Sequence, residues 1–190
     1  MKVIFSHGKE SGPWGSKIKA LANVAKQLDF NVDSIDYRGI ESPGERVQKL
    51  SDYLQNETQT KTNEPQPFIL VGSSMGGYVS LVCAQQHKKK HDKNSASLQG
   101  LFLLAPALYM PQYNVQSYSD ITNTEIIHGW SDNIIPVEHS IKYAQQAQCT
   151  LHLIDGDHRL NSSLNHVTSL FTDFLQGIVH VNQNRVKSVN

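Results

Sequence analysis

Short apolar segments alternate with helical patterns along the whole chain, and this alternation restricts the possible folds more than any other feature. Residues with helical spacing separate most of the expected strands. These strands are Val3–Phe5, Val32–Tyr37, Phe68–Val71, Leu101–Leu104, Glu125–Ile127 and Thr150–Ile154. Such a pattern predicts an α/β fold, with helices on both faces of a mostly parallel six-stranded sheet. In sheets of this kind the functional groups lie on loops at the carboxyl ends of the strands.

The helix boundaries follow from local signals. Ser42-Pro43-Gly44-Glu45 is a capping box with proline at the first helical position, so a helix should begin there. The last helix should begin near Asn161 and end at Gly177. We therefore expect one domain over residues 1–178 and a polar tail over 179–190. The basic cluster Lys88–Lys90, with His91 and Lys93, reads as a solvated loop.

Composition excludes several classes of partner. A chain of 190 residues is long enough for one core. Its formal net charge is zero and charged residues make up 18%, so neither nucleic acid nor an anionic membrane is indicated as a partner. No secretion signal or spanning segment is recognisable, which favours a cytoplasmic protein. Cys83 and Cys149 are expected to be core residues rather than a disulfide.

The segment Gly72-Ser73-Ser74-Met75-Gly76 contains G-x-S-x-G centred on Ser74. It follows an apolar strand and opens a helix, the context that a nucleophile on a sharp turn requires. Glycine on both sides leaves room for the strained backbone of the serine. A turn without chemistry is the alternative. A phosphate-binding loop is not supported, because neither of the usual glycine-rich phosphate motifs is present.

A serine hydroxyl needs a base, and the base needs a third group to orient it. On such turns the chain order is Ser, then Asp or Glu, then His. His158 fits as the base, because it lies in a loop after the last strand. Asp132 fits as the acid, because it follows the strand Glu125–Ile127. Its rivals for this role are three other aspartates, namely Asp120, Asp155 and Asp157.

Two backbone amides are expected to stabilise the oxyanion. One is the N–H of Met75, directly after the nucleophile, and the other is the N–H of Lys9 in the loop after the first strand. Further along, Tyr109, Met110 and Trp130 are predicted to line a shallow substrate wall beside Ser74. Their alternative role is to cover a helix.

Together these residues resemble the α/β-hydrolase superfamily, and the opening Ser6-His7-Gly8-Lys9-Glu10-Ser11-Gly12-Pro13-Trp14-Gly15 looks like a group of small bacterial predicted esterases. The Gly129-x-x-Asp132 block and the Asp157-His158 pair are similar to the superfamily's acid and base segments. The resemblance implies the strand order 2-1-3-4-5-6. Larger members carry a cap domain after the fourth strand, but here only residues 105–124 separate two strands, so an uncapped site is expected.

The residues favour a serine hydrolase that cleaves small carboxylic esters or thioesters through an acyl-enzyme, without metal or organic cofactor. Peptidase and acyltransferase activities use the same three residues. The alternative from another class is a hydrolase-fold protein that acts by binding a partner. Nothing in the sequence indicates the acyl group, the leaving group or the oligomeric state.

Overall fold

A computed structural model describes residues 1–59, 66–90 and 98–187 of the chain. Six strands and five helices lie within these residues, and a helix follows every strand except β4. The strands are β1 (Lys2–Ser6), β2 (Asn31–Ile35), β3 (Phe68–Ser73), β4 (Leu98–Leu104), β5 (Thr124–Gly129) and β6 (Thr150–Ile154). The helices are α1 (Ser16–Gln27), α2 (Pro43–Gln59), α3 (Met75–Lys90), α4 (Val137–Ala147) and α5 (Leu164–Lys187).

The strands form one sheet in the order β2-β1-β3-β4-β5-β6, and every neighbouring pair is parallel. The predicted fold class and strand order are therefore confirmed. The register pairs Ser6 at the end of β1 with Gly72 near the end of β3. This pairing brings the loop after β1 beside the turn that carries Ser74.

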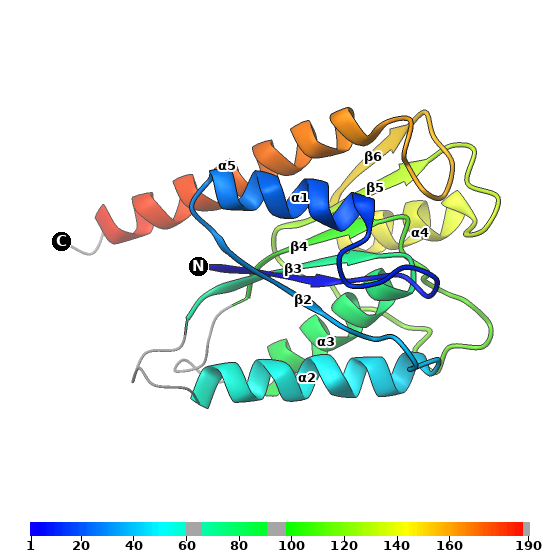
Figure 1. Ribbon diagram of the computed structural model, residues 1–190, viewed down its shortest axis with the longest axis horizontal. Helices are drawn as coiled ribbons and strands as arrows, with labels where there is room; N and C mark the ends of the chain where they lie inside the picture. The colour runs from blue at the N-terminus through cyan, green and yellow to red at the C-terminus, as the bar shows by residue number, and fades with distance from the viewer. Residues whose placement is uncertain (60–65, 91–97, 188–190) are drawn as a thin grey trace.

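Helices cover both faces of the sheet, with α1 and α5 on one face and α2, α3 and α4 on the other (Figure 1). Side chains alternate along each strand as the pleat requires. Ile4 and Leu70 pack under α2 and α3, whereas Phe5 and Ile69 pack under α1 and α5. Because both faces are covered, the central strands are apolar over most of their length.

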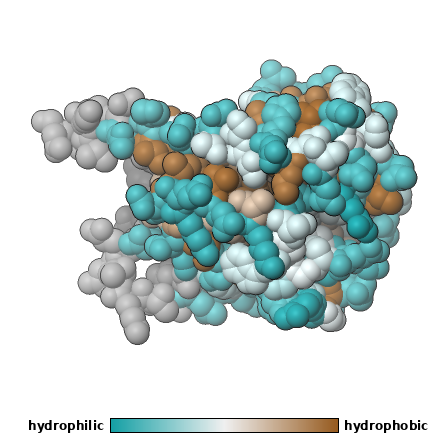
Figure 2. Space-filling model, turned by 45° about the horizontal axis from the view of Figure 1, so that its top comes forward, coloured by the Kyte–Doolittle hydropathy of each residue, from teal (hydrophilic) through white to brown (hydrophobic). Residues whose placement is uncertain are grey.

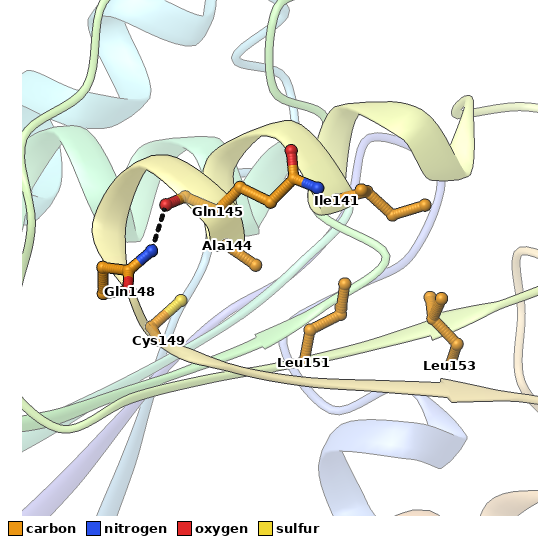
Figure 3. Close-up of a pocket in the computed structure, with 7 residues that line it drawn as sticks. All are labelled: Ile141, Ala144, Gln145, Gln148, Cys149, Leu151 and Leu153. Atoms are coloured by element: carbon orange, nitrogen blue, oxygen red, sulfur yellow. Dashed lines mark hydrogen bonds between the residues drawn. The ribbon is translucent and has the colours of Figure 1, made fainter.

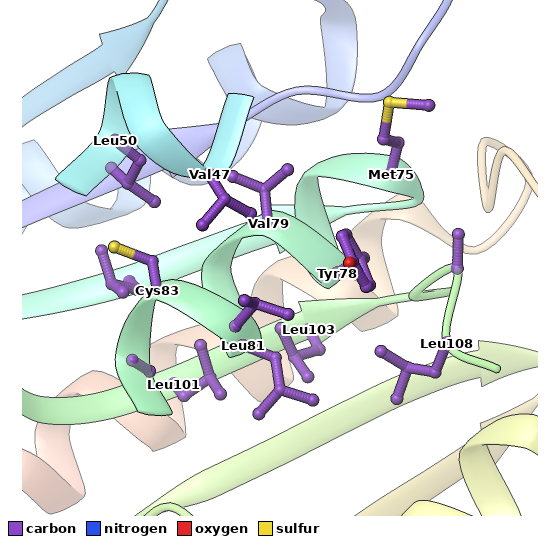
Figure 4. Close-up of a cluster of buried hydrophobic side chains, with 14 of the residues drawn as sticks. Val47, Leu50, Met75, Tyr78, Val79, Leu81, Cys83, Leu101, Leu103 and Leu108 are labelled. Carbon is purple, nitrogen blue, oxygen red and sulfur yellow. The ribbon is translucent and has the colours of Figure 1, made fainter. Parts of the chain in front are cut away.

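Helix α3 is buried along most of its length, which explains its apolar centre. Met75, Tyr78 and Val79 are almost fully buried, and Leu108 from the segment after β4 packs in the same cluster (Figure 4). The turn before this helix is therefore held between two rigid elements. Residues 105–123 contain neither helix nor strand, and no cap domain covers the sheet there.

Three predicted boundaries are wrong in the same direction. Helix α5 continues past Gly177 to Lys187, so it includes much of the segment expected to be a polar tail. Ile178 and Val179 dock against the core, and this packing compensates for the roughly 1 kcal/mol that an interior glycine costs. Helix α3 includes Lys88–Lys90, expected as a loop, because lysines favour helix and cations suit a helix C-terminus. Helix α2 likewise reaches Gln59, although the polar, proline-containing sequence from Asn56 to Pro67 predicts a connection without helix. His91 and Lys93 lie outside the described residues.

On the face seen in Figure 2, most of the coloured surface is hydrophilic or of intermediate hydropathy, and hydrophobic side chains gather in smaller areas. Neither cysteine forms a disulfide; Cys83 is buried and Cys149 is half-buried. Within the part of the chain that the structure describes, no helix has both the length and the apolar character needed to cross a membrane.

Candidate active site

Ser74 lies on the turn between β3 and α3 with a backbone φ of 55°, in the left-handed region that non-glycine residues rarely adopt. Its neighbours must be glycine for steric reasons. A Cβ on Gly72 would lie 2.4 Å from the Gly76 carbonyl oxygen, and one on Gly76 would lie 2.0 Å from the Ser6 carbonyl oxygen. Hydrogen bonds from Ser74 N to Leu104 O (2.9 Å) and from Ala107 N to Ser74 O (3.0 Å) hold the strained residue.

Three side chains from different loops form one hydrogen-bonded line at the carboxyl ends of the strands. His158 Nε2 lies 3.0 Å from Ser74 Oγ, and His158 Nδ1 lies 2.7 Å from Asp132 Oδ2. The Asp132 side chain is completely buried, whereas 19% of the His158 side chain is exposed. A base in this arrangement can accept the hydroxyl proton, while the buried carboxylate fixes its tautomer.

The loops that carry Asp132 and His158 are joined through their backbones. Trp130 N donates to Ile154 O at 2.9 Å, and Ser131 N donates to Gly156 O at 3.0 Å. The two loops are consequently fixed as one unit rather than positioned independently.

The competing aspartates have other partners. Asp157 Oδ1 accepts hydrogen bonds from Arg159 N and Leu160 N, at 2.9 and 3.0 Å, so it shapes the turn beside His158. Asp120 pairs with Lys88 at 3.0 Å on the surface. Asp155 uses its backbone carbonyl to accept the Ser163 hydroxyl. Of the four, only Asp132 contacts His158 through its carboxylate in these hydrogen bonds.

Asp132 is kept anionic by its hydrogen bonds. Burial alone would raise its pKa, but the N–H groups of Ile135 and Ile134 and the ring of His158 more than offset this effect, so the net pKa is lowered. Both amides donate to Oδ1 at 2.9 Å. The other oxygen, Oδ2, faces His158.

A second histidine, His128, contacts the same carboxylate and was not singled out from the sequence. Its Nε2 lies 3.0 Å from Asp132 Oδ2 and 3.1 Å from Ile135 O, both acceptors, so Nε2 carries the proton. Its Nδ1 then accepts the Ser140 hydroxyl at 2.7 Å. Burial lowers the pKa of His128 against the opposing effect of Asp132, which keeps the ring neutral. The signal for this residue was its place at the end of β5, four residues before Asp132.

The loop after β1 lies against Ser74. A Cβ on Gly8 would lie 3.4 Å from Ser74 Cβ, so the backbone beside Lys9 approaches Ser74 closely. Met75 is the first residue of α3, where backbone N–H groups lack intrahelical partners. The Lys9 side chain turns away and pairs with Glu41 at 3.0 Å.

The three residues predicted for the substrate wall differ in their surroundings. Tyr109 packs against α4, where Lys142 Nζ is 4.0 Å from its ring centre and its hydroxyl bonds Gln146. Met110 is half-buried against the core. Trp130 is 58% exposed next to the Asp132 loop. The contacts of Tyr109 are thus those expected of a residue that covers a helix, the alternative to a place in the substrate wall.

A separate hollow of about 490 Å³ lies between α4 and the edge strand β6 (Figure 3). It is lined by Ile141, Ala144, Gln145, Gln148, Cys149, Leu151 and Leu153. Burial raises the pKa of the Cys149 thiol to about 11, so this cysteine is a poor nucleophile near neutral pH. None of the three residues in the hydrogen-bonded line borders this hollow.

Similar solved structures have the same architecture. A protein of the α/β-hydrolase superfamily from Xanthomonas campestris pv. campestris is 27% identical with a TM-score of 0.78, covering 93% of this chain and 98% of its own. A serine hydrolase without lid from X. campestris has 17% identity and a TM-score of 0.71, covering 92% and 80%. Est1E from Butyrivibrio proteoclasticus has 16% identity and a TM-score of 0.73, covering 94% and 88%. No curated protein matches the chain.

The fold and these likenesses define an uncapped α/β-hydrolase, and the chain is a hydrolase. Residues 1–124 match the model of a hydrolase family described as serine aminopeptidase, S33. The chain belongs to this family.

Proposed function

We propose that this protein is a serine hydrolase that cleaves small carboxylic esters or thioesters through an acyl-enzyme. The observation that carries the proposal is the unbroken line from Ser74 Oγ through both ring nitrogens of His158 to Asp132, with contacts of 3.0 and 2.7 Å. A nucleophile, a base and an orienting acid in hydrogen-bond reach are the parts that acyl transfer requires.

The reaction follows from this geometry. Ser74 Oγ attacks the substrate carbonyl carbon while its proton passes to His158 Nε2, and the resulting oxyanion accepts hydrogen bonds from the amides of Lys9 and Met75. The intermediate collapses, and the leaving alkoxide or thiolate takes the proton from His158. Water then gives its proton to His158 and attacks the acyl-enzyme. Release of the acid returns that proton to Ser74 Oγ.

The shape of the surroundings supports a small substrate. No cap covers the sheet between β4 and β5, and the segment there is packed into the core, with Leu108 fully buried and Tyr113 8% exposed. Apolar side chains remain exposed in the neighbouring loops, namely Trp14, Trp130 and Ile134. An acyl chain can contact such side chains without being enclosed.

Labelling with a fluorophosphonate, followed by mass spectrometry of the peptide that carries Ser74, tests the proposal. We expect stoichiometric labelling of Ser74, none in Ser74→Ala and normal labelling in Ser73→Ala, the matched control at the adjacent serine. Folded wild-type protein that fails to label would favour the alternative, a protein that binds a partner with weak or incidental catalysis.

A substrate panel separates ester, thioester and peptide hydrolysis. Matched acetyl esters, acetyl thioesters and aminoacyl anilides would be compared by kcat/KM. We expect kcat/KM to be higher for the esters or thioesters than for the anilides. An amine leaving group needs stronger activation than an alkoxide or thiolate, and His158 alone would supply it. A preference for the anilides would replace ester cleavage with peptidase activity.

A further inference from the structure

Arg46, in the first turns of α2, is a charged residue with only 1% of its surface exposed. Among the described residues no carboxylate forms an ion pair with it, and Glu41 on the neighbouring loop pairs with Lys9 instead. Burial lowers the pKa of Arg46, yet arginine starts so far above neutrality that it stays protonated. A buried charge of this kind is costly unless the groups around it compensate.

The groups that compensate are backbone carbonyls. Arg46 Nε donates to Ile40 O at 2.7 Å, and Nη1 lies 3.2 Å from Gly8 O and 3.4 Å from His7 O. The guanidinium also lies over the Tyr37 ring, 5.3 Å from its centre. Two of the three acceptors therefore belong to the loop after β1, which abuts Ser74.

The Gly8 carbonyl has a second donor. Tyr37 N donates to His7 Nε2 at 2.9 Å, so the proton of this imidazole is on Nδ1, which donates to Gly8 O at 2.7 Å. In a trans peptide the C=O and the N–H point in opposite directions, and no described peptide is cis. The Lys9 N–H must therefore point away from Arg46 and His7.

We propose that Arg46 is a positioning residue for the oxyanion hole, which it serves by fixing and polarising the Gly8–Lys9 peptide. The charge attracts the carbonyl oxygen of this peptide and so strengthens the Lys9 N–H as a donor. Donors that are fixed before the reaction need no reorganisation when the oxyanion forms, and for this reason they stabilise it most effectively. The inference rests on the proposed acyl transfer at Ser74.

Arg46→Met tests this role, with Arg38→Met as the control. Arg38 is 72% exposed in its side chain and pairs with Asp36, so its loss should change little. Loss of a whole oxyanion donor lowers kcat by about 10²–10³. Arg46→Met keeps the Lys9 N–H and removes only its anchor, so kcat should fall by about tenfold to a hundredfold. Affinity for a trifluoromethyl ketone, whose hemiketal places an oxyanion in the hole, should fall by a similar factor. Affinity for the matching methyl ketone should change by less than about threefold.

This split between the two ketones distinguishes positioning from a general structural role. Equal loss of affinity for both ketones, or trifluoromethyl ketone affinity as strong as in the wild type, would overturn the inference. Should Arg46→Met fail to fold, Arg46→Gln decides by the same criteria, because glutamine removes the charge but keeps side-chain N–H donors for the neighbouring carbonyls. Absence of fluorophosphonate labelling in the wild type would instead overturn the proposed function.

Discussion

His128 Nε2 lies 3.0 Å from Asp132 Oδ2, the same oxygen that faces His158 Nδ1 at 2.7 Å. The carboxylate is thus held by a neutral histidine behind it and two backbone amides, and it presents one oxygen to His158. The hydrogen-bonded line therefore extends beyond three residues, through His128 to Ser140.

Replacing His128 by Phe should remove a donor from Asp132 and leave the Ser140 hydroxyl without its acceptor. Lost hydrogen bonds to charged groups cost about 1.5–3 kcal/mol, so we expect the free energy of unfolding to fall by about that amount, with a lower kcat. Urea unfolding and ester kinetics measure both effects. His152→Gln, at a half-exposed histidine paired with Glu125, is the control. Indistinguishable stability of the two variants would contradict the role given to His128.

Stability should fall as the pH drops below about 6.5. His7 and His128 are completely buried, and burial lowers the pKa of each below the usual histidine value of about 6.5. The unfolded chain therefore binds more protons than the folded protein between the lowered pKa values and 6.5, so the free energy of unfolding rises with pH across this window.

Urea unfolding of the wild type and of His128→Gln, at a series of pH values from 7 downward to about 5, checks this expectation. The variant should show a shallower decrease, because one of the two buried neutral histidines is gone. A wild-type protein that becomes more stable on acidification through this window would contradict the assignment of neutral rings.

Asp132→Asn should preserve the fold and lower kcat by about 10⁴, the cost of a mis-set histidine tautomer at a comparable site. Asp157→Asn is the matched change, since Asp157 only shapes the turn before Leu160. Steady-state kinetics on a short ester compares them. A larger loss from Asp157→Asn would mean that the acid has been assigned to the wrong residue.

Activity should peak with short acyl chains. Each buried methylene contributes only about 0.8 kcal/mol, and an uncovered site buries few of them. The value of kcat/KM should therefore rise over the first carbons and peak on the order of two to six. Chromogenic esters of increasing acyl length measure this dependence of kcat/KM. A maximum at about ten carbons or more would require a deep channel and would contradict the uncovered site.

The fold and the three aligned side chains could be predicted because each depends on a local pattern. Apolar runs gave the strands, and the glycines around Ser74 marked its turn. Asp132 and His158 were found from their places after two strands. These signals combine chain order with the rule that parallel strands end at one edge of the sheet.

Other features depend on tertiary contacts that no local pattern encodes. Arg46 sits within an ordinary helical pattern, and its burial follows from the carbonyls of a loop 38 residues away in the chain. Gly177 is a typical helix terminator, yet the packing of Ile178 against the core outweighs the low helix propensity of this glycine. The ring of Tyr109 packs on His139 of α4, a contact that no local pattern in the sequence indicates.

The assignment of Ser74 as the nucleophile is tested by the turnover of the Ser74→Ala variant. Loss of the nucleophile from a comparable set of residues lowers kcat by about 10⁶, so ester hydrolysis by this variant should be undetectable above background. Circular dichroism and thermal unfolding would establish that the fold is intact. A folded Ser74→Ala protein that retains about a tenth of the wild-type rate would contradict the assignment, because removal of a true nucleophile costs far more.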